Sequence, residues 1–368
     1  MNRSRLLKEI DDWAGRGLID AAIAERLAND VKTRVGGFSF ASVLGLLASL
    51  LLGAAILTFI AANWESVPRL GRLGLIGALI AAGPLIGAVL EARGARLAGE
   101  GARIVGSAAY GAGIALVSQM YHISGDEASG VLFWCVGTAV AAALTRSKAL
   151  TIAAILLAAA FLSMKTNLFG ISPGFPWWYP ALLAVLWALA IWTDSIGARR
   201  LVVLALIHFG LHLWIDSSSS SGMIVALAIL GLSVVMFALS VLRPVETETA
   251  LKLGGASGFL AMVGFASALF MLHWHFGDAV GGMLVVGLIG LGGAIGALWS
   301  AGAHDRLVRI SAYVMFTVEV ILVYFITVGG LIGTAAFFLS AGVALALAAF
   351  IILRLEKRVA ARASEASR

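Results

Sequence analysis

The stretch GMIVALAILGLSVVMFALSVL, residues 222–242, contains 21 residues without a charged side chain. An α-helix of that length is about 30 Å long, which matches the hydrocarbon core of a bilayer. Similar runs recur along the chain and predict an all-α fold, a polytopic transmembrane helical bundle of about 12 spans. The expected spans are residues 38–62, 70–90, 103–121, 129–145, 148–165, 177–194, 199–215, 222–242, 251–272, 279–299, 308–328 and 331–353.

The composition favours a membrane protein over a soluble domain. Of the 368 residues, 61% are hydrophobic, 12% are charged and 43 residues are glycine. Soluble domains contain about 25% charged residues, and glycine is frequent where transmembrane helices pack closely. The lipid bilayer is therefore the first expected partner. The net charge of +6 does not predict nucleic-acid binding, because the basic residues lie between the apolar runs instead of in one patch.

The distribution of basic residues predicts the topology. With the N-terminus in the cytoplasm, 23 of the 26 Lys and Arg residues fall on the cytoplasmic side, and the exceptions are Arg69, Arg72 and Lys165. Cytoplasmic loops are enriched in these residues, and adding or losing one span would reverse the side of every later loop. The pattern predicts a multi-pass protein with both termini in the cytoplasm.

The chain divides into three expected parts. Residues 1–36 predict a cytoplasmic helical hairpin, broken at Gly15 to Gly17, with Asp20 as N-cap of its second helix. Residues 37–353 form the transmembrane bundle, and residues 354–368 form a basic cytoplasmic tail. Because the hairpin is too small to fold strongly alone, we expect it to dock on the membrane face or on a cytoplasmic partner.

One acidic residue lies in the middle of an expected span. Glu319 falls near the centre of residues 308–328, and no basic residue lies within reach along that helix. An ionised carboxylate is costly in hydrocarbon, so Glu319 must be protonated, exposed to water or paired across the bundle. Two interpretations stay open: a neutral carboxyl hydrogen-bonded to a neighbour, or a site that couples to a proton or cation.

Histidine and aspartate residues gather at the expected outer ends of three spans. This outer polar cluster consists of His122, Asp126, His208, His212, Asp216, His273, His275 and Asp278. His208 and His212 share a helix face, whereas His273 and His275 cannot both point the same way. Interfacial hydrogen bonding explains any single member. The whole set predicts convergence on one polar pocket suited to metal or proton chemistry.

Four members of the cluster are candidate metal ligands. His122, His208, His212 and Asp126 offer the imidazole and carboxylate groups that bind a divalent metal such as zinc. The sequence contains no phosphate-binding glycine loop, no nucleophile elbow and no His-Glu-x-x-His motif, so no other cofactor is expected.

Three segments resemble a known family. They are QMYHISGD at residues 119–126, AANWE at residues 61–65, and the hairpin turn from Trp13 through Gly17 to Ile19. These segments are similar to bacterial integral membrane proteins of the domain of unknown function 2157 family, over about residues 6–165. The resemblance implies a protein of the bacterial inner membrane and implies no activity.

Three classes of function fit these residues. A transporter-like or channel-like bundle for a small solute or ion would place the outer polar cluster at its entrance and Glu319 deeper. A membrane-embedded metal-dependent enzyme acting on lipid or envelope substrates would use a zinc ion to activate water. A membrane sensor or scaffold would recruit a partner through its hairpin. We favour the first class, because charged groups along a pathway and abundant glycine suit transport.

Overall fold

The computed structural model describes residues 3–34, 68–122, 125–166, 174–277, 279–302 and 305–328, with single positions at 51, 58 and between 338 and 354. Every regular element in these residues is a helix, which confirms the predicted all-α class for them. The helices are α1 (Arg3–Gly15), α2 (Ala21–Arg34), α4 (Arg69–Ala92), α5 (Arg96–Met120), α6 (Glu127–Thr145), α7 (Lys148–Lys165), α8 (Tyr179–Trp192), α9 (Ile196–Asp216), α10 (Ser219–Leu242), α11 (Pro244–Leu251), α12 (Ser257–His275), α13 (Val280–Ser300) and α14 (Arg306–Val328).

Eight described helices are long and apolar enough to cross a membrane: α4, α6, α7, α9, α10, α12, α13 and α14. Two more, α5 with 25 residues and the shorter apolar α8 with 14, coincide with expected spans. The expected spans at 38–62 and 331–353 and the tail at 354–368 lie almost wholly outside the described residues. A bundle of several membrane-crossing helices is thereby supported, while the count of about 12 stays a prediction.

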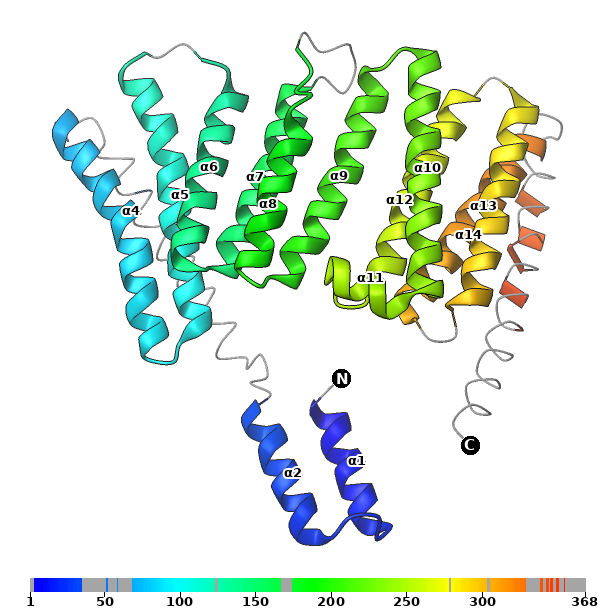
Figure 1. Ribbon diagram of the computed structural model, residues 1–368, viewed down its shortest axis with the longest axis horizontal. Helices are drawn as coiled ribbons and strands as arrows, with labels where there is room; N and C mark the ends of the chain where they lie inside the picture. The colour runs from blue at the N-terminus through cyan, green and yellow to red at the C-terminus, as the bar shows by residue number, and fades with distance from the viewer. Residues whose placement is uncertain are drawn as a thin grey trace. The chain divides into compact units, whose positions relative to one another are not determined.

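From α4 to α14 the long helices alternate in direction, so that successive turns lie at opposite ends of the bundle (Figure 1). The most extensive packing is within three antiparallel pairs, α6 with α7, α10 with α12, and α13 with α14. The α4–α5 turn contains Arg93, and the α6–α7 turn contains Arg146. Both turns lie at the same end (Figure 1), as the predicted segregation of basic residues requires.

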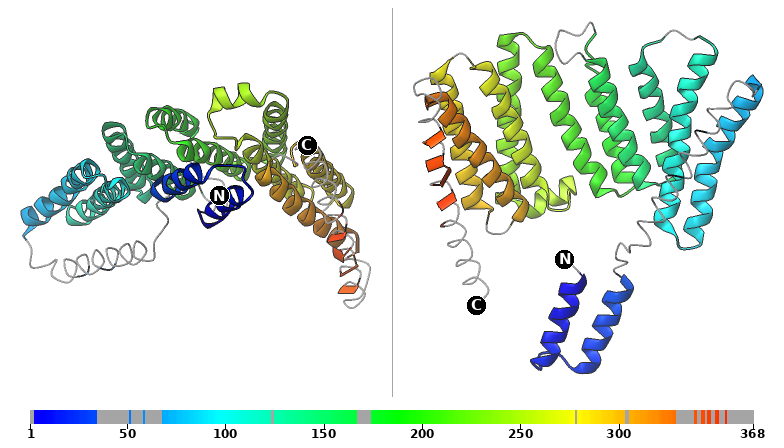
Figure 2. Two further views of the ribbon diagram at one scale, coloured as in Figure 1. Left: turned by 90° about the horizontal axis from the view of Figure 1, so that it is seen from below. Right: turned by 180° about the vertical axis from the view of Figure 1, so that it is seen from behind.

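The span expected to begin at residue 251 begins later, so this predicted boundary is wrong. The short helix α11 and a turn precede α12, and Gly254 and Gly255 in that turn have φ of +64° and +74°. Lys252, with a left-handed φ of +49°, caps the end of α11, and the two glycines adopt the left-handed backbone of the turn without strain. The Glu248 carboxylate accepts hydrogen bonds from the N–H groups of both glycines, at 2.6 and 2.9 Å. Figure 2 shows α11 lying across the ends of the neighbouring helices rather than along them.

Two large apolar cores stabilise the bundle, together with a small one at Leu253, Ala256 and Leu260. The first lies among α6, α7, α8 and α9 and includes the fully buried Leu162 and Tyr179. The second joins α10, α12, α13 and α14 and includes Leu269 and Ala312. The second core encloses the candidate site described below.

The N-terminal hairpin belongs to the first of two compact units, which extends from Met1 to Arg72. Helices α1 and α2 are joined by a turn in which Gly17 has a φ of +67°, and α2 starts directly after Asp20. Ile10 is buried in the hairpin, whereas Leu18 and Ile23 are exposed. The two helices therefore form a hairpin within residues 3–34 with apolar side chains on its surface, while the division of the chain into three parts stays a prediction.

Candidate functional site

A buried acid–base pair joins α12 to α14. His273 Nε2 lies 2.9 Å from Glu319 Oε2, and the two residues are 8% and 3% exposed. Either the imidazole N–H donates to a carboxylate, or a neutral carboxyl donates its proton to the ring nitrogen. Glu319 is thus paired across the bundle, one of the three arrangements that the sequence allowed. A pair of this kind can hold one proton between its two partners.

Glycines on α13 make room for the Glu319 side chain. A Cβ built at Gly290 would lie 2.7 Å from Glu319 Cδ and 2.8 Å from its Oε1. A Cβ at Gly287 would meet Val323 at 2.4 Å. Both distances are far inside van der Waals contact, so larger residues on this face of α13 would displace the side chains of α14. The pair therefore depends on three helices: α12 and α14 supply its groups, and α13 supplies the space.

The pair borders a large cavity. Its volume is about 1100 Å³, and its wall comes from α9, α12, α13 and α14. Five described lining residues carry hydrogen-bonding side-chain groups, namely His273, Glu319, Ser267, Ser311 and Trp274 through its indole N–H, and the other described lining residues are apolar or glycine. Both serine hydroxyls donate to carbonyl oxygens of their own helices. The cavity is therefore apolar except around the pair.

One nitrogen of the pair has no partner among the described residues. This atom, Nδ1 of His273, is buried and makes no hydrogen bond. A buried polar atom left unpaired costs about 1–3 kcal/mol. The pair is thus incomplete as a hydrogen-bonding unit.

Two other predicted histidines form a separate group on α9. The rings of His208 and His212 lie 4.5 Å apart between centroids. His208 Nε2 lies 3.0 Å from Ser163 Oγ, and His212 Nδ1 lies 2.6 Å from Thr166 Oγ1. Each hydroxyl already donates to a carbonyl of α7, so each ring nitrogen acts as the donor in these contacts. These bonds tie α9 to α7, and they match the interfacial hydrogen bonding expected of single histidines.

Asp126 belongs to a third group, at the start of α6. Its carboxylate accepts from Lys165 Nζ and from the Ser129 backbone N–H, both at 2.5 Å. The Lys165 hydrogen bond, followed by the Ser129 hydrogen bonds, lowers the pKa of Asp126 to about 2. The nearby His122 is exposed and adopts a φ of +50°. Asp126 thus works as a helix cap and ion-pair partner.

The remaining cluster members have different surroundings. His275 is half-buried, with its ring 5.0 Å from that of Phe276 between centroids. Asp216 is the last residue of α9, and Asp278 lies outside the described residues. Within the described part of the chain, no group of three or more His, Cys, Asp or Glu residues is arranged to hold a metal ion. The four candidate zinc ligands, His122, Asp126, His208 and His212, therefore do not form such a group there.

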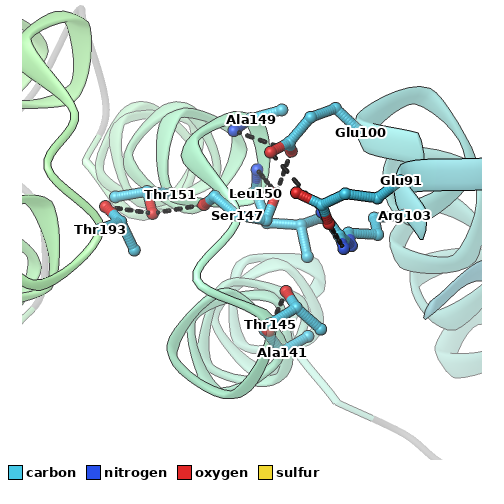
Figure 3. Close-up of polar contacts among 10 residues, drawn as sticks. All are labelled: Glu91, Glu100, Arg103, Ala141, Thr145, Ser147, Ala149, Leu150, Thr151 and Thr193. Carbon is cyan, nitrogen blue, oxygen red and sulfur yellow. Dashed lines mark hydrogen bonds and ion pairs between the residues drawn. The ribbon is translucent and has the colours of Figure 1, made fainter. Parts of the chain in front are cut away.

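A polar network at the opposite end of the bundle was not predicted (Figure 3). Arg103 on α5 is 5% exposed and donates through Nη2 to Glu91 of α4. Its Nη1 lies 3.6 Å from Glu100. Glu100 in turn accepts from the Ser147 hydroxyl and from the Ala149 N–H at the start of α7. The network connects α4 and α5 with the α6–α7 turn.

The sequence signal for this network was ambiguous. Arg103 stands at the edge of an expected span and was counted with the cytoplasmic loop, yet it is a buried residue within α5. Thr151 extends the polar contacts to Thr193 after α8, with 3.1 Å between the two hydroxyl oxygens. The spacing of Glu100 and Arg103, three residues apart on one helix face, was the available sign of an ion pair.

These features define the class: a multi-helix membrane protein with a buried acid–base pair beside an apolar cavity. Residues 11–151 match the family described as "Predicted membrane protein (DUF2157)", which confirms the resemblance over this part of the chain. No curated protein and no solved structure matches the chain. The network around Arg103 lies within the matched residues, whereas His273 and Glu319 lie beyond them.

Proposed function

We propose that this protein moves a small solute or ion across the bacterial inner membrane and couples the movement to a proton held by His273 and Glu319. The observation that supports this function best is the 2.9 Å hydrogen bond between two buried titratable groups on the wall of a cavity of about 1100 Å³. Ionisable residues inside transmembrane helices commonly mark ion or proton pathways. Both termini are assigned to the cytoplasm by the distribution of basic residues.

The chemistry of the pair suits proton coupling. Histidine and acidic side chains form the proton relays of many pumps and transporters. Gaining a proton turns a hydrogen-bonded imidazole–carboxylate pair into an imidazolium–carboxylate or an imidazole–carboxylic acid pair. Either change alters the charge on the cavity wall and with it the affinity for an occupant. A proton and a solute would thereby influence each other's binding.

The two other classes of function receive less support. A metal-dependent enzyme would need a ligand set, and the candidate His122, Asp126, His208 and His212 have other contacts or separate positions. A scaffold would act through the N-terminal hairpin, whose exposed Leu18 and Ile23 do not identify a partner.

Proton flux into liposomes tests this function. The purified protein is reconstituted with a pH-sensitive dye inside, and a potassium diffusion potential drives protons inward. We expect the wild type to admit protons faster than protein-free liposomes and Glu319→Gln to lose this flux, because the amide keeps the shape but cannot exchange a proton. Glu127→Gln, at an exposed position in the first turn of α6, is the matched control and should behave as wild type. A Glu319→Gln flux equal to that of wild type would exclude the proposed role.

A further inference from the structure

Arg146 in the α6–α7 turn is held in place by a tryptophan. It follows the last residue of α6 with a left-handed φ of +49°, and its guanidinium carbon lies 4.3 Å from a ring centroid of Trp192, the last residue of α8. A guanidinium over an aromatic face is attracted by the electrons of the ring. The indole N–H of Trp192 in turn donates to the Ala143 carbonyl of α6 at 3.1 Å. Both side chains therefore have defined positions at the seam between α6 and α8.

No carboxylate neutralises Arg146 in the part of the chain that the structure describes. Asp194 lies 3.7 Å from both Lys148 Nζ and Arg199 Nη2. Glu100 accepts hydrogen bonds from the start of α7. The Arg146 side chain is exposed, and a guanidinium offers N–H donors in a planar fork that fits the oxygens of a phosphate group. An unpaired cation of defined position is therefore open to an anionic ligand.

Exposed apolar side chains lead away from this cation along both helices. On α6 they recur three or four residues apart, at Phe133, Val136, Val140 and Leu144. On α8 the exposed Val185 lies seven residues before Trp192, on the same helix face. The two helices lie within expected membrane spans and contact each other. Their exposed faces therefore meet the hydrocarbon of the bilayer, with Arg146 and Trp192 at the end where both helices stop.

This arrangement favours a lipid over a soluble anion. Free phosphate would contact the guanidinium alone, whereas a phospholipid would also cover the apolar side chains of α6 and α8. Tryptophan is enriched at the level of the lipid headgroups, and basic sites between transmembrane helices on the cytoplasmic side bind anionic headgroups. The distribution of basic residues assigns the α6–α7 turn to that side.

We propose that Arg146 and Trp192 bind the phosphate of an anionic phospholipid, whose acyl chains lie along the exposed faces of α6 and α8. The guanidinium donates to the phosphate oxygens, and the ring fixes the guanidinium from its other side. This site is separate from His273 and Glu319, and the proposal does not depend on the transport function.

Lipid titration followed by native mass spectrometry tests the proposal. The delipidated full-length protein in detergent is titrated with dioleoylphosphatidylglycerol, which is anionic, and with dioleoylphosphatidylcholine, which has the same chains and no net charge. We expect the first bound phosphatidylglycerol to bind about 5-fold more tightly than phosphatidylcholine, as one basic residue near the membrane surface predicts. An excess of inorganic phosphate should not displace it.

Two variants with matched controls locate the lipid. Arg146→Gln should weaken phosphatidylglycerol binding about 5-fold and make the two lipids bind alike. Arg93→Gln removes the same charge from an exposed position in the α4–α5 turn, at the same end of the bundle, and should bind as wild type. Trp192→Leu should weaken binding about 2- to 5-fold, as the loss of an exposed cation–π contact predicts. Trp299→Leu, at an exposed position near the end of α13, should have no effect.

Several results would overturn the proposal. They are equal affinity of the two lipids for the wild type, unchanged binding to Arg146→Gln, and an equal loss in Arg93→Gln. Displacement of the lipid by inorganic phosphate would assign the site to free phosphate and exclude the lipid. Because these substitutions leave His273 and Glu319 unchanged, every one of these results is independent of whether Glu319→Gln loses proton flux.

Discussion

Replacing Gly290 by alanine tests how α13 makes room for the acid–base pair. The added Cβ would lie 2.7 Å from Glu319 Cδ, whereas carbon atoms pack at about 3.5–4.0 Å. The carboxyl must therefore move by roughly 1 Å, which its 2.9 Å bond to His273 cannot tolerate without lengthening or breaking. Overpacking of this kind lowers the free energy of unfolding by about 1–3 kcal/mol. The higher helix propensity of alanine offsets up to about 1 kcal/mol of that loss.

Gly292 on the same helix supplies the control. A Cβ built there meets no described atom within 4 Å. Gly292→Ala therefore gains the helix propensity of alanine without a steric clash. We expect the free energy of unfolding of Gly290→Ala to be lower than that of Gly292→Ala by about 1–3 kcal/mol. Reversible unfolding by SDS in mixed micelles measures this difference, and the proton flux of Gly290→Ala should fall as well. Equal stability and equal flux in the two variants would refute the packing of Glu319 against Gly290.

Three further predictions concern the pairings and the topology. Because Lys165 and Ser129 lower the pKa of Asp126 from 3.8 to about 2, its stabilising contribution is complete above pH 3.8 and is lost as the pH falls toward 2. Over that pH range, the melting temperature of the wild type should fall more steeply with decreasing pH than that of Asp126→Asn. An identical pH dependence of the two melting temperatures would count against the ion pair. His273→Phe and Glu319→Leu should each lower the free energy of unfolding by about 3–5 kcal/mol. In a double-mutant cycle measured by unfolding in SDS, the double variant should lose much less stability than the sum of the two single variants. Strictly additive losses would mean that the two residues do not interact. Reporter fusions should place Lys165 in the periplasm and the C-terminus in the cytoplasm, and a periplasmic C-terminus would exclude the expected topology.

The fold was readable from the sequence because membrane insertion depends on local composition. Uncharged runs such as residues 222–242 became helices such as α10, since a spanning segment must satisfy its backbone hydrogen bonds within itself. The error at residue 251 arose because hydropathy alone cannot detect a break in a helix. Here α11 ends at the left-handed Lys252, and a turn through Gly254 and Gly255 precedes α12.

The candidate site was only partly readable. The need of Glu319 for a partner, water or a proton follows from the cost of a charge in hydrocarbon. Its partner His273 is 46 residues away, and their contact depends on α12 packing beside α14. Periodicity within one helix cannot supply such a pairing. His208, His212 and His273 were likewise predicted to share one site because they lie at a similar depth in the membrane. The lateral packing of the helices separates them: His208 and His212 contact the α7 side, and His273 contacts α14.

Infrared titration of Glu319 in lipid nanodiscs is the most direct test of proton handling by the buried pair. The difference between spectra of wild type and Glu319→Gln isolates the carbonyl stretch of the protonated carboxyl. We expect this band to change in intensity when the pH is varied over a range of about 5 to 8, and to shift in His273→Phe. A Glu319 carboxyl that keeps one protonation state throughout this range and is insensitive to His273→Phe would contradict the proposed coupling.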